Sequence, residues 1–326
     1  MKVHLLRKPG AGPGPTPLIL SYGWPWSTFT MLKAVDRLAD PGAYGGDPAD
    51  AFDVIVPALP GTGFSGPPAR PDLNFWKIAD LWHKLMTEVL GYEKYAAAGG
   101  DMGALVTEQL GHKYAGELHA IHLSSSIPLT LFNGDRPWDL TGGAPIPPGV
   151  PPEIRDQILF FQKRFVAHVA VHVLDSSTIG HGLTDSPAGM LAWVLERWTN
   201  WSDNDGDVEN VFSKDEILTN ATTIWATDTI ASSMRLYANA ARYPWTPSHD
   251  RRPAIEAPTG ITFVGYENPP GVTTENRVAN FLNGPKAPWY NHVNLTAHPR
   301  GGHFVPWEVP DEFVDDLRRT FRGRVS

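Results

Sequence analysis

The sequence predicts an α/β fold, a mostly parallel sheet with helices on both faces and an inserted helical lid. Toward both ends of the chain, short apolar runs alternate with longer amphipathic ones, which is typical of a parallel sheet covered by helices. Between these two parts the signals are mainly helical and rich in Trp. We therefore expect a core made of residues 1–127 and 251–326, with the lid at residues 128–250.

The first part of the core has strand and helix signals in alternation. Apolar runs of strand length are separated by stretches whose apolar residues recur at helical spacing. Gly91 closes the second of these helices, as a glycine after the last helical turn often does. The expected strands are 3–6, 17–20, 52–59, 94–98 and 120–125, and the expected helices are 29–38, 75–90 and 104–114.

The pattern changes at a Pro/Gly-rich stretch, residues 142–152, which has neither a strand nor a helix signal. Helical signals follow from residue 153 to about residue 241. The strand pattern returns at residues 260–264, and the remaining elements are a helix at 274–282, a strand at 293–297 and a closing helix at 310–321. We infer that the lid is inserted between two strands of one sheet.

Composition narrows the class of protein. The chain has 326 residues, 42% of them hydrophobic, so it can bury a large core. The net charge is -8 and Lys and Arg form no stripe, which argues against a nucleic-acid partner. No apolar run approaches the about 18 residues of a membrane helix, and no signal peptide is recognisable. We expect a cytoplasmic protein. Because it has no Cys, disulfides and cysteine nucleophiles are excluded.

Asp101 is the central residue of the motif GGDMG at residues 99–103, between a predicted strand and a predicted helix. Glycines two positions before and after it permit a strained turn that exposes the central side chain, a nucleophile elbow. The alternative is an aspartate that only caps the next helix. The chain has no G-x-S-x-G motif, so a serine nucleophile is excluded.

A base and an acid follow the candidate nucleophile in the required order. Glu267 follows the strand that resumes after the lid, and His303 lies in the glycine-rich loop RGGHF at residues 300–304. Separately, each could be a solvated loop residue, but open α/β sheets place their sites at the carboxyl ends of strands, where all three lie. Glu275 is a rival acid, but it begins a predicted helix, where a carboxylate is favoured by the helix dipole. We therefore assign the acid to Glu267.

The motif YGWP at residues 22–25 follows the strand that ends at residue 20, where this arrangement supplies an oxyanion-hole N–H. We expect the backbone donors to be those of Trp24 and Met102. A carboxylate nucleophile displaces at carbon and leaves an alkyl ester, which a His-activated water then hydrolyses. This chemistry suits epoxides and alkyl halides. Epoxide opening needs a proton donor such as a Tyr hydroxyl, whereas a halide needs N–H donors.

These motifs, together with PALPGTGFSG at residues 57–66, resemble the microsomal-type epoxide hydrolases of the α/β-hydrolase superfamily. The likeness continues through the lid and covers nearly the whole chain, with LTDSP at 183–187, WSD at 201–203 and SSMRLY at 232–237. By this resemblance Asp101 is the nucleophile, Glu267 the acid and His303 the water-activating base. Tyr237 is then the lid tyrosine that protonates the opening epoxide oxygen, and no cofactor is required.

The sequence departs from that family at four places. Tyr22 replaces a His, and Met102 replaces a Trp that a dehalogenase would use. The family has a second lid tyrosine, and its position, counted back from DSP at 185–187, is occupied here by His168. His168 either replaces that tyrosine as a donor or packs on a lid helix. The segment that precedes the first strand in the family is not found, so we expect a short form or a truncated chain.

Three functions stay open at this point. The first is an epoxide hydrolase that forms a vicinal diol, with an apolar epoxide and water as its partners. The second is a haloalkane-type dehalogenase that uses the same three residues, and the third is a non-catalytic binder of a small apolar ligand. For the oligomeric state, we allow for a homodimer. The pocket should be apolar, because lid aromatics must face it in part; they are Phe160, Phe161, Phe165, Trp193, Trp198 and Trp225.

Two weaker patterns suggest metal ligands. His168 and His172 are spaced i, i+4, but the H-E-x-x-H pattern is absent. Residues 203–207 (DNDGD) are similar to a calcium loop, but the Gly falls at the wrong loop position. We therefore expect no metal site.

Overall fold

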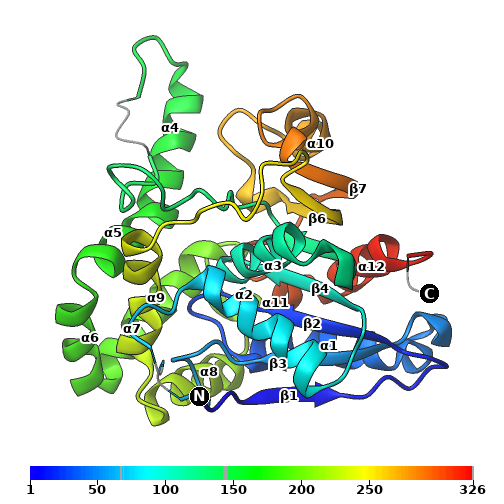
Figure 1. The fold of residues 1–326 in the computed structure, drawn as a ribbon. Helices are drawn as coiled ribbons and strands as arrows, with labels where there is room; N and C mark the ends of the chain where they lie inside the picture. The colour runs from blue at the N-terminus through cyan, green and yellow to red at the C-terminus, as the bar shows by residue number, and fades with distance from the viewer. Residues whose placement is uncertain (67, 69, 142–145, 325–326) are drawn as a thin grey trace.

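The computed structural model describes residues 1–66, 68, 70–141 and 146–324, and these contain a seven-stranded sheet (Figure 1). The strand order is β1-β3-β2-β4-β5-β6-β7. The edge strand β1 runs antiparallel to β3, and every other neighbouring pair is parallel. The strands are β1 (Leu5–Lys8), β2 (Thr16–Ser21), β3 (Phe52–Pro57), β4 (Tyr95–Gly100), β5 (Leu118–Ser124), β6 (Ile255–Val264) and β7 (Tyr290–His298). The prediction of a mostly parallel sheet is confirmed.

Helices cover both faces of the sheet, as predicted. One face carries α2 (Phe75–Lys84), α3 (Met102–Lys113) and α10 (Thr274–Leu282), and the other carries α1 (Leu32–Ala39), α11 (Val305–Glu308) and α12 (Pro310–Phe321). Neighbouring residues of β6 show the two sides, because Thr262 bonds to Asp316 of α12 whereas the Phe263 ring contacts Phe281 of α10. β3 and β4 are buried along their whole length, as expected of strands covered on both faces.

The inserted helices lie between β5 and β6, at the left end of the sheet in Figure 1. They are α4 (Pro152–Phe161), α5 (Ala167–Leu174), α6 (Ser176–Asp185), α7 (Pro187–Trp201), α8 (Lys214–Ala226) and α9 (Ile230–Arg242). α4 projects away from the rest of the molecule. Residues 142–145 of the Pro/Gly-rich stretch lie outside the described residues. We keep 128–250 as the proposed bounds of the lid.

The expected elements differ from the observed ones mainly at strand ends. β1 lies two residues later than expected, because its pairing with β3 continues to exposed Lys8. β6 begins at Ile255, where irregular pairing with β7 precedes the regular ladder. The expected helix 75–90 is α2 followed by a wider helical turn at Leu85–Val89. α10 and α12 have the predicted bounds. None of the described helices is long and apolar enough to cross a membrane.

Candidate active site

Asp101 lies in a sharp turn between β4 and α3. Its φ is 52° and its ψ is -132°, a conformation that non-glycine residues adopt only under strain. The flanking glycines allow the turn to close, since a Cβ on Gly99 would lie 2.3 Å from the carbonyl oxygen of Gly103. A Cβ on Gly103 would lie 2.2 Å from that of Ser21. The carboxyl end of β2 pairs with that of β4, so the YGWP turn lies beside Asp101.

The two oxygens of the Asp101 carboxylate have different partners. Oδ1 accepts a hydrogen bond from the Trp24 backbone N–H at 2.8 Å, and Oδ2 accepts one from His303 Nε2 at 3.0 Å. Gly23 lies so close that a Cβ there would be 2.0 Å from Oδ1. Asp101 is only 6% exposed. One oxygen therefore lies at the backbone donors while the other faces the imidazole.

His303 joins the two carboxylates. Its Nδ1 lies 2.5 Å from Glu267 Oε1, and its Nε2 bonds to Asp101. Because carboxylates only accept hydrogen bonds, both ring nitrogens donate, which requires the imidazolium form. Burial lowers the pKa of His303, but the Glu267 charge and the hydrogen bonds with both carboxylates outweigh burial and raise it to about 10.

The pKa of Asp101 shifts in the opposite direction. Burial raises the pKa of this carboxyl, but the hydrogen bond and charge of His303 outweigh that effect. The backbone N–H groups of Met102 and Trp24 add to the lowering. The result is a pKa below the usual value, so the resting site holds a buried carboxylate and imidazolium pair.

Glu308 holds the loop that carries His303, and sequence reasoning missed it. Its carboxyl oxygens accept hydrogen bonds from the backbone N–H groups of Gly302, Phe304 and Asp203 at 2.8–2.9 Å. Burial raises the pKa of Glu308 to about 7, against those hydrogen bonds. Its position five residues after His303 offers no recognisable motif, because the three donors are brought together only by the fold.

A cavity of about 420 Å³ opens on the triad. Asp101, Glu267 and His303 all line it, as does Met102. Much of its wall is apolar and comes from the lid and from the segment after β5, including Ile127, Leu131, Phe161, Phe165, Val169 and Trp201. The expected apolar pocket is therefore present, with Phe161 and Phe165 among its aromatics, while Trp198 is fully buried against Trp307 of α11. Arg277 and Lys286 also line the cavity, and the sequence analysis did not identify either.

Two predicted lid donors lie close together. The His168 ring lines the cavity, stacks on Trp24 with 5.7 Å between centroids and contacts the Tyr237 ring at 5.8 Å. Tyr237 is 1% exposed and is not among the described residues that line the cavity. Neither the Tyr237 hydroxyl nor either His168 ring nitrogen has a hydrogen-bond partner among the described residues. Burial raises the pKa of Tyr237 and lowers that of His168, so both stay neutral.

The residues weighed as metal ligands have other neighbours. The His172 ring packs at 4.3 Å from the Trp24 ring and 4.8 Å from the Tyr237 ring. In residues 203–207, Asp203 and Asp205 form ion pairs with Arg300, which ties the lid to the His303 loop. No group of three or more candidate metal ligands occurs within the part of the chain that the structure describes. Glu275 lies in the first turn of α10.

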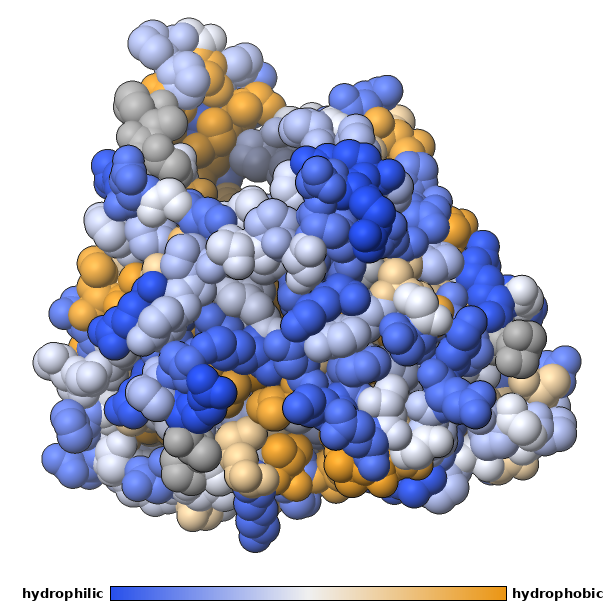
Figure 2. All heavy atoms as spheres, in the orientation of Figure 1, coloured by the Kyte–Doolittle hydropathy of each residue, from blue (hydrophilic) through white to orange (hydrophobic). Residues whose placement is uncertain are grey.

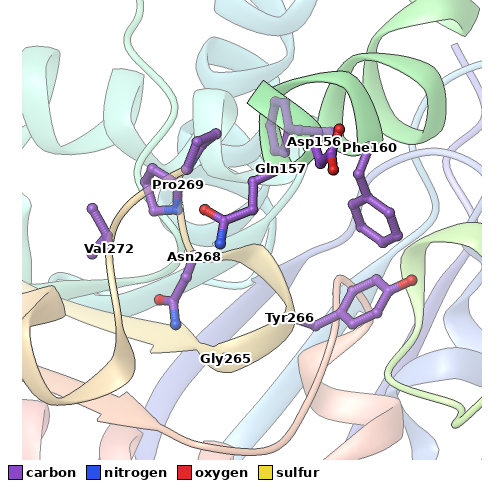
Figure 3. Close-up of a pocket in the computed structure, with 10 residues that line it drawn as sticks. Asp156, Gln157, Phe160, Gly265, Tyr266, Asn268, Pro269 and Val272 are labelled. Atoms are coloured by element: carbon purple, nitrogen blue, oxygen red, sulfur yellow. The ribbon is translucent and has the colours of Figure 1, made fainter. Parts of the chain in front are cut away.

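A second hollow, of about 450 Å³, lies between α4 and the loop that follows β6 (Figure 3). In Figure 3, Gln157 and Phe160 extend from α4 toward Tyr266 and Pro269. Gln157 Oε1 accepts a hydrogen bond from the Gly271 N–H at 2.8 Å. Figure 2 shows hydrophobic side chains on the α4 projection beside a hollow. Because Phe161, Pro269 and Pro270 line both spaces, this groove adjoins the cavity of the triad.

Comparisons with known proteins bear on the family of this chain. Residues 19–145 match the model of the alpha/beta hydrolase fold. A putative epoxide hydrolase of Stigmatella aurantiaca is 34% identical over 98% of this chain and 67% of its own length. Epoxide hydrolase 1 of Oryctolagus cuniculus is 28% identical over 97% of this chain and 71% of its own.

Solved structures give the same fold. The juvenile hormone epoxide hydrolase of Bombyx mori has a TM-score of 0.73 at 24% identity, over 99% of this chain and 73% of its own. The Aspergillus niger epoxide hydrolase has a TM-score of 0.72 at 24% identity, over 99% and 76%. At this identity the structural likeness supports the fold alone.

Proposed function

Because this chain belongs to the epoxide hydrolases of the α/β-hydrolase superfamily, we propose that it opens an epoxide to a vicinal diol through a covalent ester on Asp101. The observation that carries this proposal is the bonding of the Asp101 carboxylate, with Oδ1 at the Trp24 N–H and Oδ2 at His303. An oxygen that faces the cavity can attack carbon while the other stays in the oxyanion hole. Water is the second substrate.

In the first step, Asp101 Oδ2 attacks an epoxide carbon. The ester C–O bond forms, the ring C–O bond breaks, and its electron pair stays on the leaving oxygen as an alkoxide. Tyr237 gives that alkoxide a proton, and His168 donates a hydrogen bond to it. Both groups are neutral and unpartnered among the described residues, and His168 lines the cavity. This leaves Tyr237 as a phenolate, and the proton that the His303 imidazolium releases restores its hydroxyl, which leaves His303 neutral.

In the second step, neutral His303 takes a proton from a water that attacks the carbonyl carbon of the ester. Glu267 holds the ring through Nδ1 and stabilises the imidazolium that forms. Negative charge develops on Oδ1, where the backbone N–H groups of Trp24 and Met102 stabilise it. Collapse of this intermediate breaks the ester C–O bond, and the leaving oxygen takes the second proton of the attacking water to complete the diol. His303 keeps the first proton, so the carboxylate and imidazolium pair is restored.

The other two functions are less consistent with this site. Halide release needs free N–H donors at the leaving group, but the indole N–H of Trp201, which lines the cavity, donates to Arg164 O at 2.7 Å. The Trp24 indole N–H donates to Ser233 Oγ. A non-catalytic binder would not need Asp101 in a strained conformation, fully bonded to a base and an oxyanion hole.

A single turnover in H₂¹⁸O tests the ester. When enzyme exceeds epoxide, attack of water on the Asp101 carbonyl places ¹⁸O in the protein, whereas direct attack on the epoxide places it in the diol. We expect the label in Asp101 by peptide mass spectrometry, no diol from Asp101→Asn, and a stable adduct on His303→Gln. His181→Gln, an exposed lid histidine, is the matched control. Label found in the diol instead would refute the ester.

A further inference from the structure

Two cationic side chains line the active-site cavity outside the machinery described above. Arg277 belongs to α10, and Lys286 follows α10 in the chain. Ser126, which contacts Lys286, also lines the cavity, as do Pro269 and Pro270 and the apolar wall of the lid. The proposed reaction uses neither cation, and an apolar epoxide gives neither a partner.

Neither cation is neutralised within the described part of the chain. Arg277 forms no ion pair there, its Nε is buried without a hydrogen-bond partner, and its guanidinium lies 4.4 Å from the centre of the Phe263 ring. The Lys286 amino group donates to the Ser126 carbonyl oxygen at 3.2 Å and forms no ion pair among the described residues either. Lys286 is exposed, but Arg277 is half-buried, and a partly buried cation without an ion pair is costly. An anion beside Arg277 in this part of the cavity would therefore be stabilised.

The nearby carboxyl groups are occupied elsewhere. Glu267 is bonded to His303. Glu108 accepts a hydrogen bond from the Tyr290 hydroxyl at 2.7 Å, and burial raises its pKa to about 8 against that bond and the charge of Lys286. The charge of Glu267 acts on Arg277 and that of Glu108 on Lys286, but neither carboxyl group forms an ion pair with its cation among the described residues.

We propose that the substrate is an epoxide whose apolar part ends in a carboxylate, and that Arg277 and Lys286 bind this carboxylate while the lid aromatics hold the chain between it and the epoxide ring. The planar guanidinium fork matches a carboxylate. The inference rests on the proposed function, because it assigns the substrate of the same site. It revises the expectation of a wholly apolar substrate, since only the middle of the ligand is apolar.

A kinetic comparison tests the proposal with matched pairs of substrates. Aryl and alkyl epoxy acids of different chain lengths are compared with their methyl esters, which differ only in charge. We expect kcat/KM for the best acid to exceed that of its ester by roughly tenfold to a hundredfold, the range for a hydrogen-bonded charge. Arg277→Gln and Lys286→Gln should reduce this ratio, mainly through KM, and Arg277→Lys should retain part of it.

The control is Lys94→Gln, which removes one positive charge from an exposed position before β4, at the end of the sheet opposite the site. It should leave the acid-to-ester ratio unchanged. Equal kcat/KM for acids and esters, or a ratio that Arg277→Gln does not lower, would overturn the inference. A preference for the corresponding epoxy phosphate over the acid would overturn the choice of carboxylate.

Binding separates this inference from the reaction itself. Calorimetry with 4-phenylbutyrate and with its amide requires no turnover, so it reports on the two cations even when the mechanism is wrong. We expect the acid to bind at least tenfold more tightly to the wild type, and Arg277→Gln to abolish the difference. Equal binding of acid and amide would refute the carboxylate site, whereas absence of diol from every epoxide would refute the proposed function.

Discussion

Gly23→Ala should disable the oxyanion hole without removing any catalytic group. The new methyl carbon would lie 2.0 Å from Asp101 Oδ1 and 2.3 Å from Asp101 Cβ, whereas non-bonded carbon atoms pack at about 3.5–4.0 Å. Either the Asp101 side chain or the YGWP turn must therefore move by roughly 1 Å. Both movements break the 2.8 Å bond from the Trp24 N–H. Loss of one oxyanion donor costs about 10²–10³ in kcat, or about 3–4 kcal/mol.

The assay is diol formation at saturating epoxide, with intact-protein mass spectrometry to follow the ester. Because negative charge on Oδ1 develops in the second step, the ester should accumulate in Gly23→Ala. Gly182→Ala in α6 is the control, since a Cβ at Gly182 meets no atom within 4 Å. It should retain wild-type kcat. A Gly23→Ala enzyme that is folded and has wild-type kcat would show that the Trp24 N–H does not stabilise the reaction.

Three further predictions follow from contacts of the site. Tyr237→Phe removes a buried hydroxyl that has no partner among the described residues, so Tm should stay constant while stopped-flow ring opening slows about 10²-fold or more; His168→Gln should slow the same step. Glu308→Ala leaves three backbone N–H groups without acceptors at about 1–3 kcal/mol each, so denaturant unfolding should show a loss on the order of 3 kcal/mol or more, together with a lower kcat. Asp101→Asn should bring the pKa of His303 down from about 10, as an NMR titration would show. Since that pKa is raised in the folded state, the ion pair stabilises the wild type fully below about pH 6.5, and this stabilisation is lost as pH rises through about 10. Between these two pH values, Tm of the wild type should fall more than Tm of Asp101→Asn.

The fold could be predicted from the spacing at which apolar residues recur, which is a local property of the chain. α10 and α12 have amphipathic patterns that end at recognisable positions, so their bounds were predictable. Strand ends were not, because pairing with a neighbour decides them. β1 continues to Lys8 only because β3 offers partners there, and no local apolar signal marks that position.

The residues of the site likewise include some that local sequence predicts and some that it does not. Asp101 is recognisable because the glycines around it are required by the turn itself, so the motif carries the geometry. Glu308, Arg277 and Lys286 have no such motif. Their positions at the site depend on where α10, the loop after it and the His303 loop meet the lid, and these contacts join residues far apart in the chain.

In the proposed mechanism, the coupling of His303 to two carboxylates also explains how one residue can be an imidazolium in the resting site and a base in the second step. In the resting site, Asp101 contributes both a hydrogen bond and a negative charge to the raised pKa of His303. Formation of the ester removes that charge, because an alkylated carboxylate is neutral. Only Glu267 then opposes the effect of burial, so the pKa of His303 falls and the ring can give up its proton as the epoxide oxygen acquires one. The first step that we propose therefore creates the base that the second step requires, and hydrolysis of the ester would restore the carboxylate and return His303 to the imidazolium form.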